Sequence, residues 1–113
     1  MEPNDAVAAL SALAHPGRLA IFRLLVRAGE QGLPAGRIAE ETGSLANTLS
    51  ANLNILTGAG LTGSRREGRS IIYTANFERM RDLLGFLMED CCAGEPAICM
   101  PVSEMARQAC RAC

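Results

Sequence analysis

The chain has 113 residues, of which 49% are hydrophobic and 20% are charged. A chain of this length and composition forms one small globular domain, which excludes wholesale disorder. The formal net charge is −1, so bulk charge gives no support to nucleic-acid binding. No apolar run approaches the length of a membrane span and the N-terminus lacks a signal-peptide pattern, so we expect a protein of the cytoplasm that does not contact a membrane.

Apolar residues recur at helical spacing in four segments before residue 60. The expected helices span residues 5–14, 18–28, 34–42 and 45–58. The second is apolar on most of its sides, so we expect it to be the central, most buried helix. Gly43 ends the third helix, and Ser44 is the expected N-terminal cap of the fourth. The apolar stripe of the fourth helix comprises Leu45, Leu49, Leu53 and Leu56.

Beyond residue 61 the pattern changes to that of extended chain. Residues 62–66 and 70–75 flank a short polar segment, and the second of them is rich in β-branched residues, so we predict a β-hairpin with Gly68 in its turn. The short glycine-containing connection between the third and fourth helices is typical of a helix-turn-helix. Together these features predict a mainly α fold with a small β-hairpin, a winged helix-turn-helix.

A last helix is predicted over residues 77–91. Its apolar stripe comprises Phe77, Met80, Leu84, Leu87 and Cys91, spaced three, four, three and four residues apart. Gly94 and Pro96 are stop signals beyond it.

Three motifs carry a family resemblance. They are residues 14–19 (AHPGRL), 48–61 (TLSANLNILTGAGL) and 65–73 (RREGRSIIY). Over residues 7–88 the chain resembles the ArsR (ArsR/SmtB) family of metal- and metalloid-sensing repressors. The resemblance implies a homodimer whose interface is formed by the first and last helices. It also implies that two recognition helices enter successive major grooves of double-stranded operator DNA, and that an inducer releases the repressor.

The candidate DNA-binding residues lie on the fourth helix and on the hairpin. They are Asn47, Thr48, Ser50, Asn54, Arg65, Arg66 and Arg69. The short polar side chains of the helix suit base edges and phosphate oxygens, and a guanidinium on a wing suits the minor groove or a phosphate. The alternative is that the polar helix residues form an ordinary solvent-exposed face and that the arginines only make the hairpin soluble. The family often carries Gln and His where this chain has Ala46 and Ala51, which is a departure from the family pattern.

All five cysteines lie after residue 90. Their odd number argues against a disulfide framework, and their clustering argues for a thiol site. Cys91, Cys92 and Cys99 resemble the C-terminal Cys-Cys…Cys constellation of arsenite-sensing members of the family. Three thiolates without an imidazole form a soft site that suits pyramidal trivalent arsenic or antimony, whereas zinc prefers four ligands. The expected inducer is therefore trivalent arsenic (arsenite) or antimony, with no organic cofactor.

Two other metal sites of the family lack their ligands in this sequence. Residues 34–42 contain no cysteine, which excludes an arsenite site within the third helix, and His15 is the only histidine, which excludes the zinc site along the last helix. Adjacent residues of a helix face different ways, so ligation by both Cys91 and Cys92 requires the helix to end or unwind there. Ligation within one subunit and ligation between subunits both stay open.

We expect residues 1–92 to form the DNA-binding and dimerisation domain, and residues 93–113 to form a tail that completes the metalloid site. Two alternatives share this fold: a sensor of soft cations (cadmium, lead or zinc) and a thiol redox sensor. Cys110 and Cys113 are expected to have no essential role, and His15 to be structural. No Cys–His–acid set accompanies the lone histidine, so we do not expect an enzyme.

Overall fold

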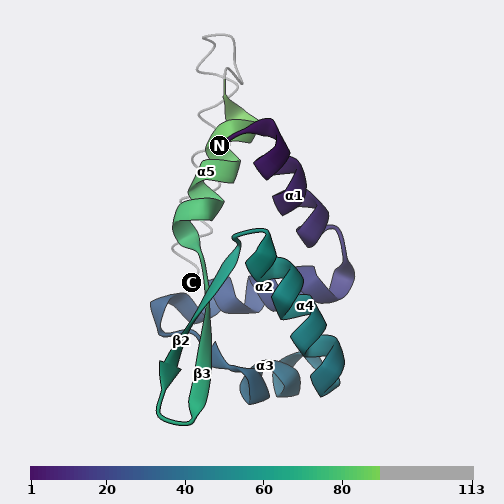
Figure 1. Cartoon of the computed structure of the whole chain (residues 1–113), viewed down its shortest axis with the longest axis vertical. Helices are drawn as coiled ribbons and strands as arrows, with labels where there is room; N and C mark the ends of the chain where they lie inside the picture. The colour runs from purple at the N-terminus through teal and green to yellow at the C-terminus, as the bar shows by residue number, and fades with distance from the viewer. Residues whose placement is uncertain (90–113) are drawn as a thin grey trace.

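The computed structural model describes residues 1–89, which form a helical domain with a small three-stranded sheet (Figure 1). In chain order the described elements are α1 (Pro3–Leu13), α2 (Pro16–Ala28), the 3₁₀ turn η1 (Gly29–Gln31), β1 (Leu33–Pro34), α3 (Ala35–Thr42), α4 (Ala46–Gly58), β2 (Thr62–Glu67), β3 (Ser70–Ala75) and α5 (Phe77–Met88). Helices α3 and α4 form the helix-turn-helix and the β2–β3 hairpin forms the wing. The predicted fold class is therefore confirmed.

A sharp bend separates α1 from α2. His15 caps α2, because its Nδ1 accepts hydrogen bonds from the backbone N–H groups of Gly17 at 3.1 Å and Arg18 at 3.3 Å. Pro16 takes the first helical position, so α2 begins two residues earlier than the sequence predicts.

Within residues 1–89 no single helix is long and apolar enough to cross a membrane. Among these residues, only the pair Pro3–Leu13 and Pro16–Gln31, which is bent by 100°, has the length and composition of a span when the two helices are taken together.

Helix α2 lies at the centre of the core, as predicted. Ile21, Phe22 and Leu25 are fully or almost fully buried, and α2 packs against α1, α3, α4 and β3. Burying each such side chain stabilises the fold by about 1.5–3 kcal/mol relative to leaving it exposed. The remaining buried core residues are Ala6, Ala9, Ala12, Ile38, Leu49, Leu53, Leu56, Ala59, Leu61, Ala75 and Leu83.

The sheet is antiparallel, with the strand order β1-β3-β2. The predicted hairpin is confirmed: Glu67 pairs with Ser70, and Gly68 adopts φ 61° in the turn between them. Strand β1 was not predicted. The sequence analysis assigns Pro34 to the first turn of α3, whereas the structure pairs it with Ile72 of β3 and begins α3 one residue later. A two-residue strand has no periodicity of its own, so only its pairing defines it.

Three further predictions, two for α4 and one for α5, are wrong. Ser44 does not cap α4, because its hydroxyl lies 2.8 Å from the Thr42 hydroxyl and the N-cap position belongs to Leu45. Leu45 is also 74% exposed, so it does not belong to the buried stripe of α4. Helix α5 ends at Met88 rather than at residue 91, and Glu89 is already in the extended region (φ −57°, ψ 126°). Cys91 lies outside the described residues.

The elements gather at two ends of the domain. In Figure 1, α1 and α5 lie together at the top, whereas α3, the beginning of α4 and the tip of the β2–β3 hairpin lie at the bottom. Helix α2 and the sheet connect the two ends. The helix-turn-helix and the tip of the wing therefore lie apart from α1 and α5, the helices that the family resemblance implies for a dimer interface.

Candidate DNA interface

The turn before α4 is fixed by local hydrogen bonds. Gly43 adopts a left-handed conformation (φ 68°, ψ 19°), which glycine tolerates without a steric cost, and its N–H bonds to the Ala39 carbonyl. The Thr42 hydroxyl donates to the Ile38 carbonyl at 2.8 Å. These contacts hold α3 and α4 at a defined angle, so the position of α4 is set by the chain itself.

One face of α4 is anchored and the other is exposed. Leu49, Leu53 and Leu56 are buried in the core. Because residues three and four apart share a helix face, the intervening polar residues point away from the core. The four residues of α4 that the sequence analysis selected are all exposed: Asn47, Thr48, Ser50 and Asn54.

Asn52 has a different environment from the other polar residues of α4. It is only 6% exposed, and its Nδ2 lies 3.3 Å from the position that a Cβ on Gly17 would take. Asn52 therefore faces the beginning of α2 and is not part of the exposed polar face. It is not among the residues that the sequence predicts to contact DNA.

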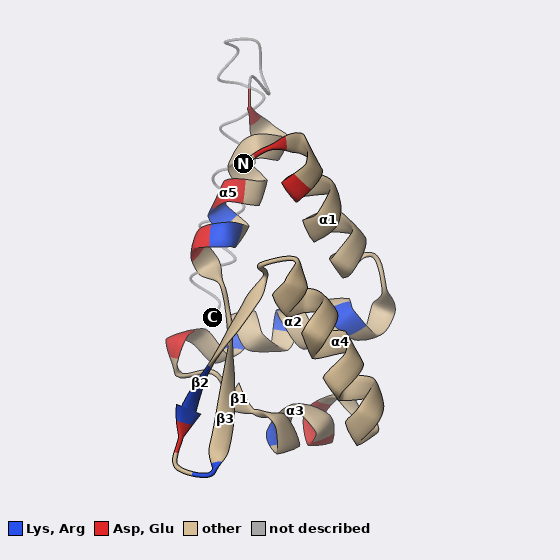
Figure 2. Ribbon diagram, in the orientation of Figure 1, with Lys and Arg blue, Asp and Glu red and all other residues tan. Residues whose placement is uncertain are grey.

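The N-terminus of α4 is suited to negative charge. No side chain caps it, and the first turn carries no acidic residue. The first N–H groups of a helix lack intrahelical partners and lie at the positive end of its dipole. Helix α4 has no charged side chain at all (Figure 2), so nothing on the helix itself opposes the approach of an anion.

The three arginines of the wing are not equivalent. Arg65 donates hydrogen bonds from its guanidinium to the carbonyls of Glu30 at 3.1 Å and Gln31 at 2.7 Å, and its Nε lies 3.5 Å from the Glu67 carboxylate. Arg66 and Arg69 are exposed and make no ion pair with the acids of residues 1–89. Arg65 thus braces the wing against η1, and Arg66 and Arg69 are the guanidinium groups that a partner of the wing would meet.

Asn76 connects the start of α5 to the segment between α4 and β2. Its side chain accepts a hydrogen bond from the Arg79 N–H at 3.1 Å and donates one to the Gly60 carbonyl at 3.0 Å, while its backbone N–H bonds to the Leu61 carbonyl. The α4–β2 connection and the start of α5 therefore form one hydrogen-bonded unit. Asn76 is absent from the residues predicted from the sequence, although an asparagine just before an amphipathic segment is a helix-cap signal.

The outer sides of α1 and α5 carry large apolar residues without a cover in the described chain. Helix α1 exposes Val7 (65%) and Leu10, and α5 exposes Phe77, Leu84 (52%) and Leu87. The α1 face that packs inward consists of alanines instead, and the inward residue of α5 is Leu83. Arg79 of α5 and Asp5 of α1 face one another at 3.8 Å, which joins the two helices.

The predicted thiol site lies outside the described residues, as do Cys91, Cys92, Cys99, Cys110 and Cys113. Within residues 1–89 no group of three or more His, Cys, Asp or Glu side chains is arranged to hold a metal ion.

Comparison with known proteins agrees with this geometry. A family model described as a helix-turn-helix domain matches residues 13–62. The chain is 32% identical over 89 residues to the HTH-type transcriptional regulator YgaV of Escherichia coli (strain K12), a match that covers 79% of this chain and 88% of that protein.

Solved structures extend the comparison. The homodimeric winged helix-turn-helix DNA-binding domain of Mb0332 from Mycobacterium bovis, a possible ArsR-family transcriptional regulator, has a TM-score of 0.62 at 31% identity and covers 77% of this chain and 81% of its own. A possible transcriptional regulator for arsenical resistance has a TM-score of 0.60 at 28% identity, with 70% and 79% of the two chains covered.

The recognition-helix geometry, the braced wing and these relatives agree on one assignment. The match to YgaV covers 88% of that protein, and the match to the winged helix-turn-helix domain of Mb0332 covers 77% of this chain. The chain belongs to the ArsR family of winged helix-turn-helix transcriptional regulators.

Proposed function

We propose that this protein is a transcriptional repressor that binds operator DNA as a homodimer and dissociates when trivalent arsenic or antimony binds to Cys91, Cys92 and Cys99. The observation that carries the DNA-binding part is the exposed, uncharged polar face of α4, which lies at the same end of the domain as the wing (Figure 1). A helix with short polar side chains and an uncapped N-terminus fits the major groove, where base edges and phosphates lie together.

The residues that contact DNA in this proposal are those selected from the sequence, with one difference in role. Asn47 and Thr48 lie in the first turn of α4, where they reach phosphates and the first base edges, and Ser50 and Asn54 extend the contact along the groove. Arg66 and Arg69 bind the DNA backbone or the minor groove beside the wing. Arg65 positions the wing and contributes its charge from there.

The homodimer is supported by the apolar residues that α1 and α5 leave exposed. A partner subunit that covered these side chains would stabilise the dimer by about 25 cal/mol for each Å² of apolar surface removed from water. Mb0332, at 31% identity, is a homodimer. Two copies joined through α1 and α5 present two α4 helices on the opposite side, which is the arrangement that a two-fold operator requires.

The metalloid part of the proposal depends on the donor set and on where α5 ends. Three thiolates provide the three sulfur ligands of a trivalent arsenic or antimony ion, which retains its lone pair. Cys91 and Cys92 are adjacent, so both can bind one ion only if the helix ends before them. Helix α5 ends at Met88, in agreement with this requirement. The related structure described as a possible regulator for arsenical resistance adds support.

Coupling between the two functions follows from the connection at Asn76. Ligation of thiols just beyond α5 shifts the end of a helix whose exposed apolar face joins the two subunits. The other end of that helix is hydrogen-bonded to the connection between α4 and β2. A displacement of α5 therefore changes the distance or mobility of the two α4 helices, which needs a difference of only a few kcal/mol between the two states.

The experiment is an operator-release titration with the reduced full chain and a duplex selected in vitro for tight binding. Arsenite at one equivalent per site is expected to release the DNA from the wild type. Cys91→Ser, Cys92→Ser and Cys99→Ser are each expected to abolish release without weakening DNA binding, and the matched Cys110→Ser/Cys113→Ser variant to respond normally.

The same titration separates the alternatives. Release by cadmium, together with loss of the response in the Cys110→Ser/Cys113→Ser variant, would assign the protein to soft cations. Release by peroxide and not by arsenite would assign it to thiol redox sensing. An arsenite response that persists in all three single-serine variants would overturn the proposed site.

A further inference from the structure

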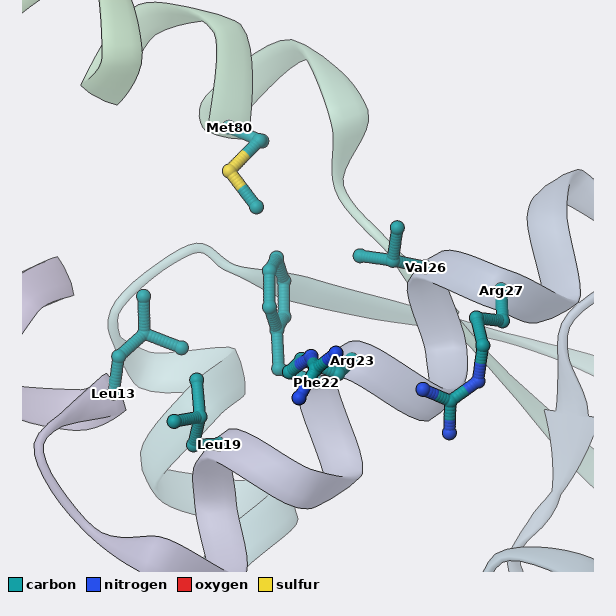
Figure 3. Close-up of a pocket in the computed structure, with 7 residues that line it drawn as sticks. All are labelled: Leu13, Leu19, Phe22, Arg23, Val26, Arg27 and Met80. Atoms are coloured by element: carbon teal, nitrogen blue, oxygen red, sulfur yellow. The ribbon is translucent and has the colours of Figure 1, made fainter. Parts of the chain in front are cut away.

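An apolar cavity lies between α1, α2 and α5, away from the residues proposed to contact DNA. It has a volume of about 300 Å³. Figure 3 shows Met80 of α5 above the ring of Phe22, with Leu13 and Leu19 on one side and Val26 on the other. Cavities of this size with apolar walls and a few polar groups are typical of small-molecule sites.

Two arginines complete the lining of this cavity. Arg23 and Arg27 are exposed residues on α2, one helical turn apart, and both border the cavity. No ion pair joins either guanidinium to an acid within residues 1–89, whereas Arg37, Arg65 and Arg79 each face a carboxylate. Like charges at this spacing repel one another, so an anion that bridges them is favoured.

We propose that this cavity is a binding site for a small amphipathic carboxylate. The hydrocarbon part lies against Phe22, Val26 and Met80, and the carboxylate accepts hydrogen bonds from Arg23 and Arg27. A guanidinium is the side chain best matched to a carboxylate, since its N–H groups form a planar fork. The site is a second input to the regulator, chemically distinct from a soft metalloid.

The position of the site adds to the argument. Met80 belongs to α5, which carries the apolar face proposed for dimerisation, and Phe22 belongs to α2, the centre of the DNA-binding domain. A ligand between them contacts the helix proposed for dimerisation and the central helix that packs against α3 and α4. A second copy of this protein, packed through α1 and α5, is the competing occupant of this space, and the experiment below distinguishes it from a small ligand.

The test is calorimetric titration of the reduced full-length protein with decanoate below its micelle concentration, with decylamine as the cationic counterpart. Saturable binding of one decanoate per chain is expected, with no saturable binding of decylamine. Arg23→Gln/Arg27→Gln should weaken decanoate binding at least about ten-fold. Leu19→Trp, which fills the cavity from a partly exposed position, should abolish it. The matched control Arg37→Gln, on α3 and outside this cavity, should bind like the wild type.

Every other outcome overturns the inference. Absence of decanoate binding would do so directly, as would equal affinity in the double-glutamine variant, which would mean hydrocarbon adsorption only. If Leu19→Glu converts the protein to monomers and decanoate does not bind the wild type, the cavity is part of the contact between copies. Circular dichroism and thermal melts verify that each variant is folded, so loss of binding is not confused with loss of structure.

Discussion

The guanidinium of Arg65 donates a 2.7 Å hydrogen bond to the carbonyl of Gln31, a residue 34 positions earlier in the chain. A second bond of 3.1 Å reaches the neighbouring carbonyl of Glu30. Both acceptors belong to η1, so a side chain of the wing satisfies carbonyls at the end of the α2 segment. One of the three arginines of the wing therefore helps to fix the orientation of the wing, together with the pairing of β3 with β1.

This relationship predicts opposite phenotypes for two adjacent arginines. Arg65→Ala removes two hydrogen bonds from a charged donor that is partly exposed, so it should lower the free energy of unfolding by about 1 kcal/mol. Arg66→Ala removes a solvated side chain and should leave stability within about 0.5 kcal/mol of the wild type. Urea unfolding followed by circular dichroism measures both.

The same two variants should also differ in the salt dependence of DNA binding. Arg66→Ala should reduce the slope of log affinity against log salt by about two for the dimer, one phosphate contact per subunit. The measurement is fluorescence anisotropy at several salt concentrations. If Arg65→Ala leaves stability unchanged while Arg66→Ala lowers it, the assignment of brace and DNA contact is reversed.

A second prediction concerns Gly32, which precedes β1. Its φ is 67°, and an added Cβ would lie 2.3 Å from the Tyr73 carbonyl oxygen and 2.7 Å from Cγ2 of Thr74. Gly32→Ala should therefore lower the free energy of unfolding by about 2–6 kcal/mol, from the strain of a positive φ with an extended ψ and from displacement of β3. Chemical denaturation gives the value.

Gly29→Ala is the matched control for this substitution. Gly29 has almost the same φ, 69°, but no atom lies within 4 Å of the added methyl group. It should cost only the strain of a positive φ combined with an extended ψ, about 1–3 kcal/mol, and less than Gly32→Ala. Equal losses in the two variants would mean that close approach to β3 plays no part.

Local sequence signals predicted those parts of the fold that local chemistry decides. The hairpin follows from Gly68 between two β-rich segments, and the α1–α2 break follows from Pro16 after a polar cap. The exposed face of α4 follows from the spacing of its buried leucines. Each of these depends on residues within about one helical turn of one another, which is the range that periodicity and capping describe.

The remaining features depend on partners distant in the sequence. Strand β1 exists because Leu33 pairs with Tyr73, and the bracing role of Arg65 depends on η1. Ser44 is a good capping residue by type, yet its hydroxyl bonds to Thr42 instead. A pattern in one sequence does not show whether the side chain of an arginine or serine is free or is hydrogen-bonded to another part of the folded chain.

The third prediction tests the reading face of α4. Asn47→Ala removes an exposed amide in the first turn and should weaken specific DNA binding about ten-fold while leaving the oligomeric state and stability unchanged. Binding to unrelated duplexes should change much less, because base contacts specify sequence. Ser11→Ala, an exposed polar substitution on α1, is the control and should bind DNA like the wild type. Equal effects on specific and unrelated duplexes would assign Asn47 to phosphate contact instead.

The fourth prediction concerns the apolar face of α5. Leu84→Glu places a charge at the centre of the surface proposed to join two subunits, and the desolvation of an unpaired carboxylate there opposes association. We expect analytical ultracentrifugation to show monomers at micromolar concentration. The monomer should be folded, because Leu84 is 52% exposed and makes no part of the core.

Leu45→Glu provides the matched control for this last change. Leu45 is an even more exposed leucine, at 74%, but it lies at the start of α4, at the opposite end of the domain (Figure 1). This variant should remain dimeric and should lose DNA affinity, since its carboxylate faces the phosphates and opposes the N-terminal charge that α4 offers them. Leu84→Glu should also lose DNA affinity, but for a different reason: the dimer dissociates, and each monomer contacts only one half of the operator. If Leu45→Glu dissociates the dimer and Leu84→Glu does not, the two ends of the domain have exchanged the functions assigned to them.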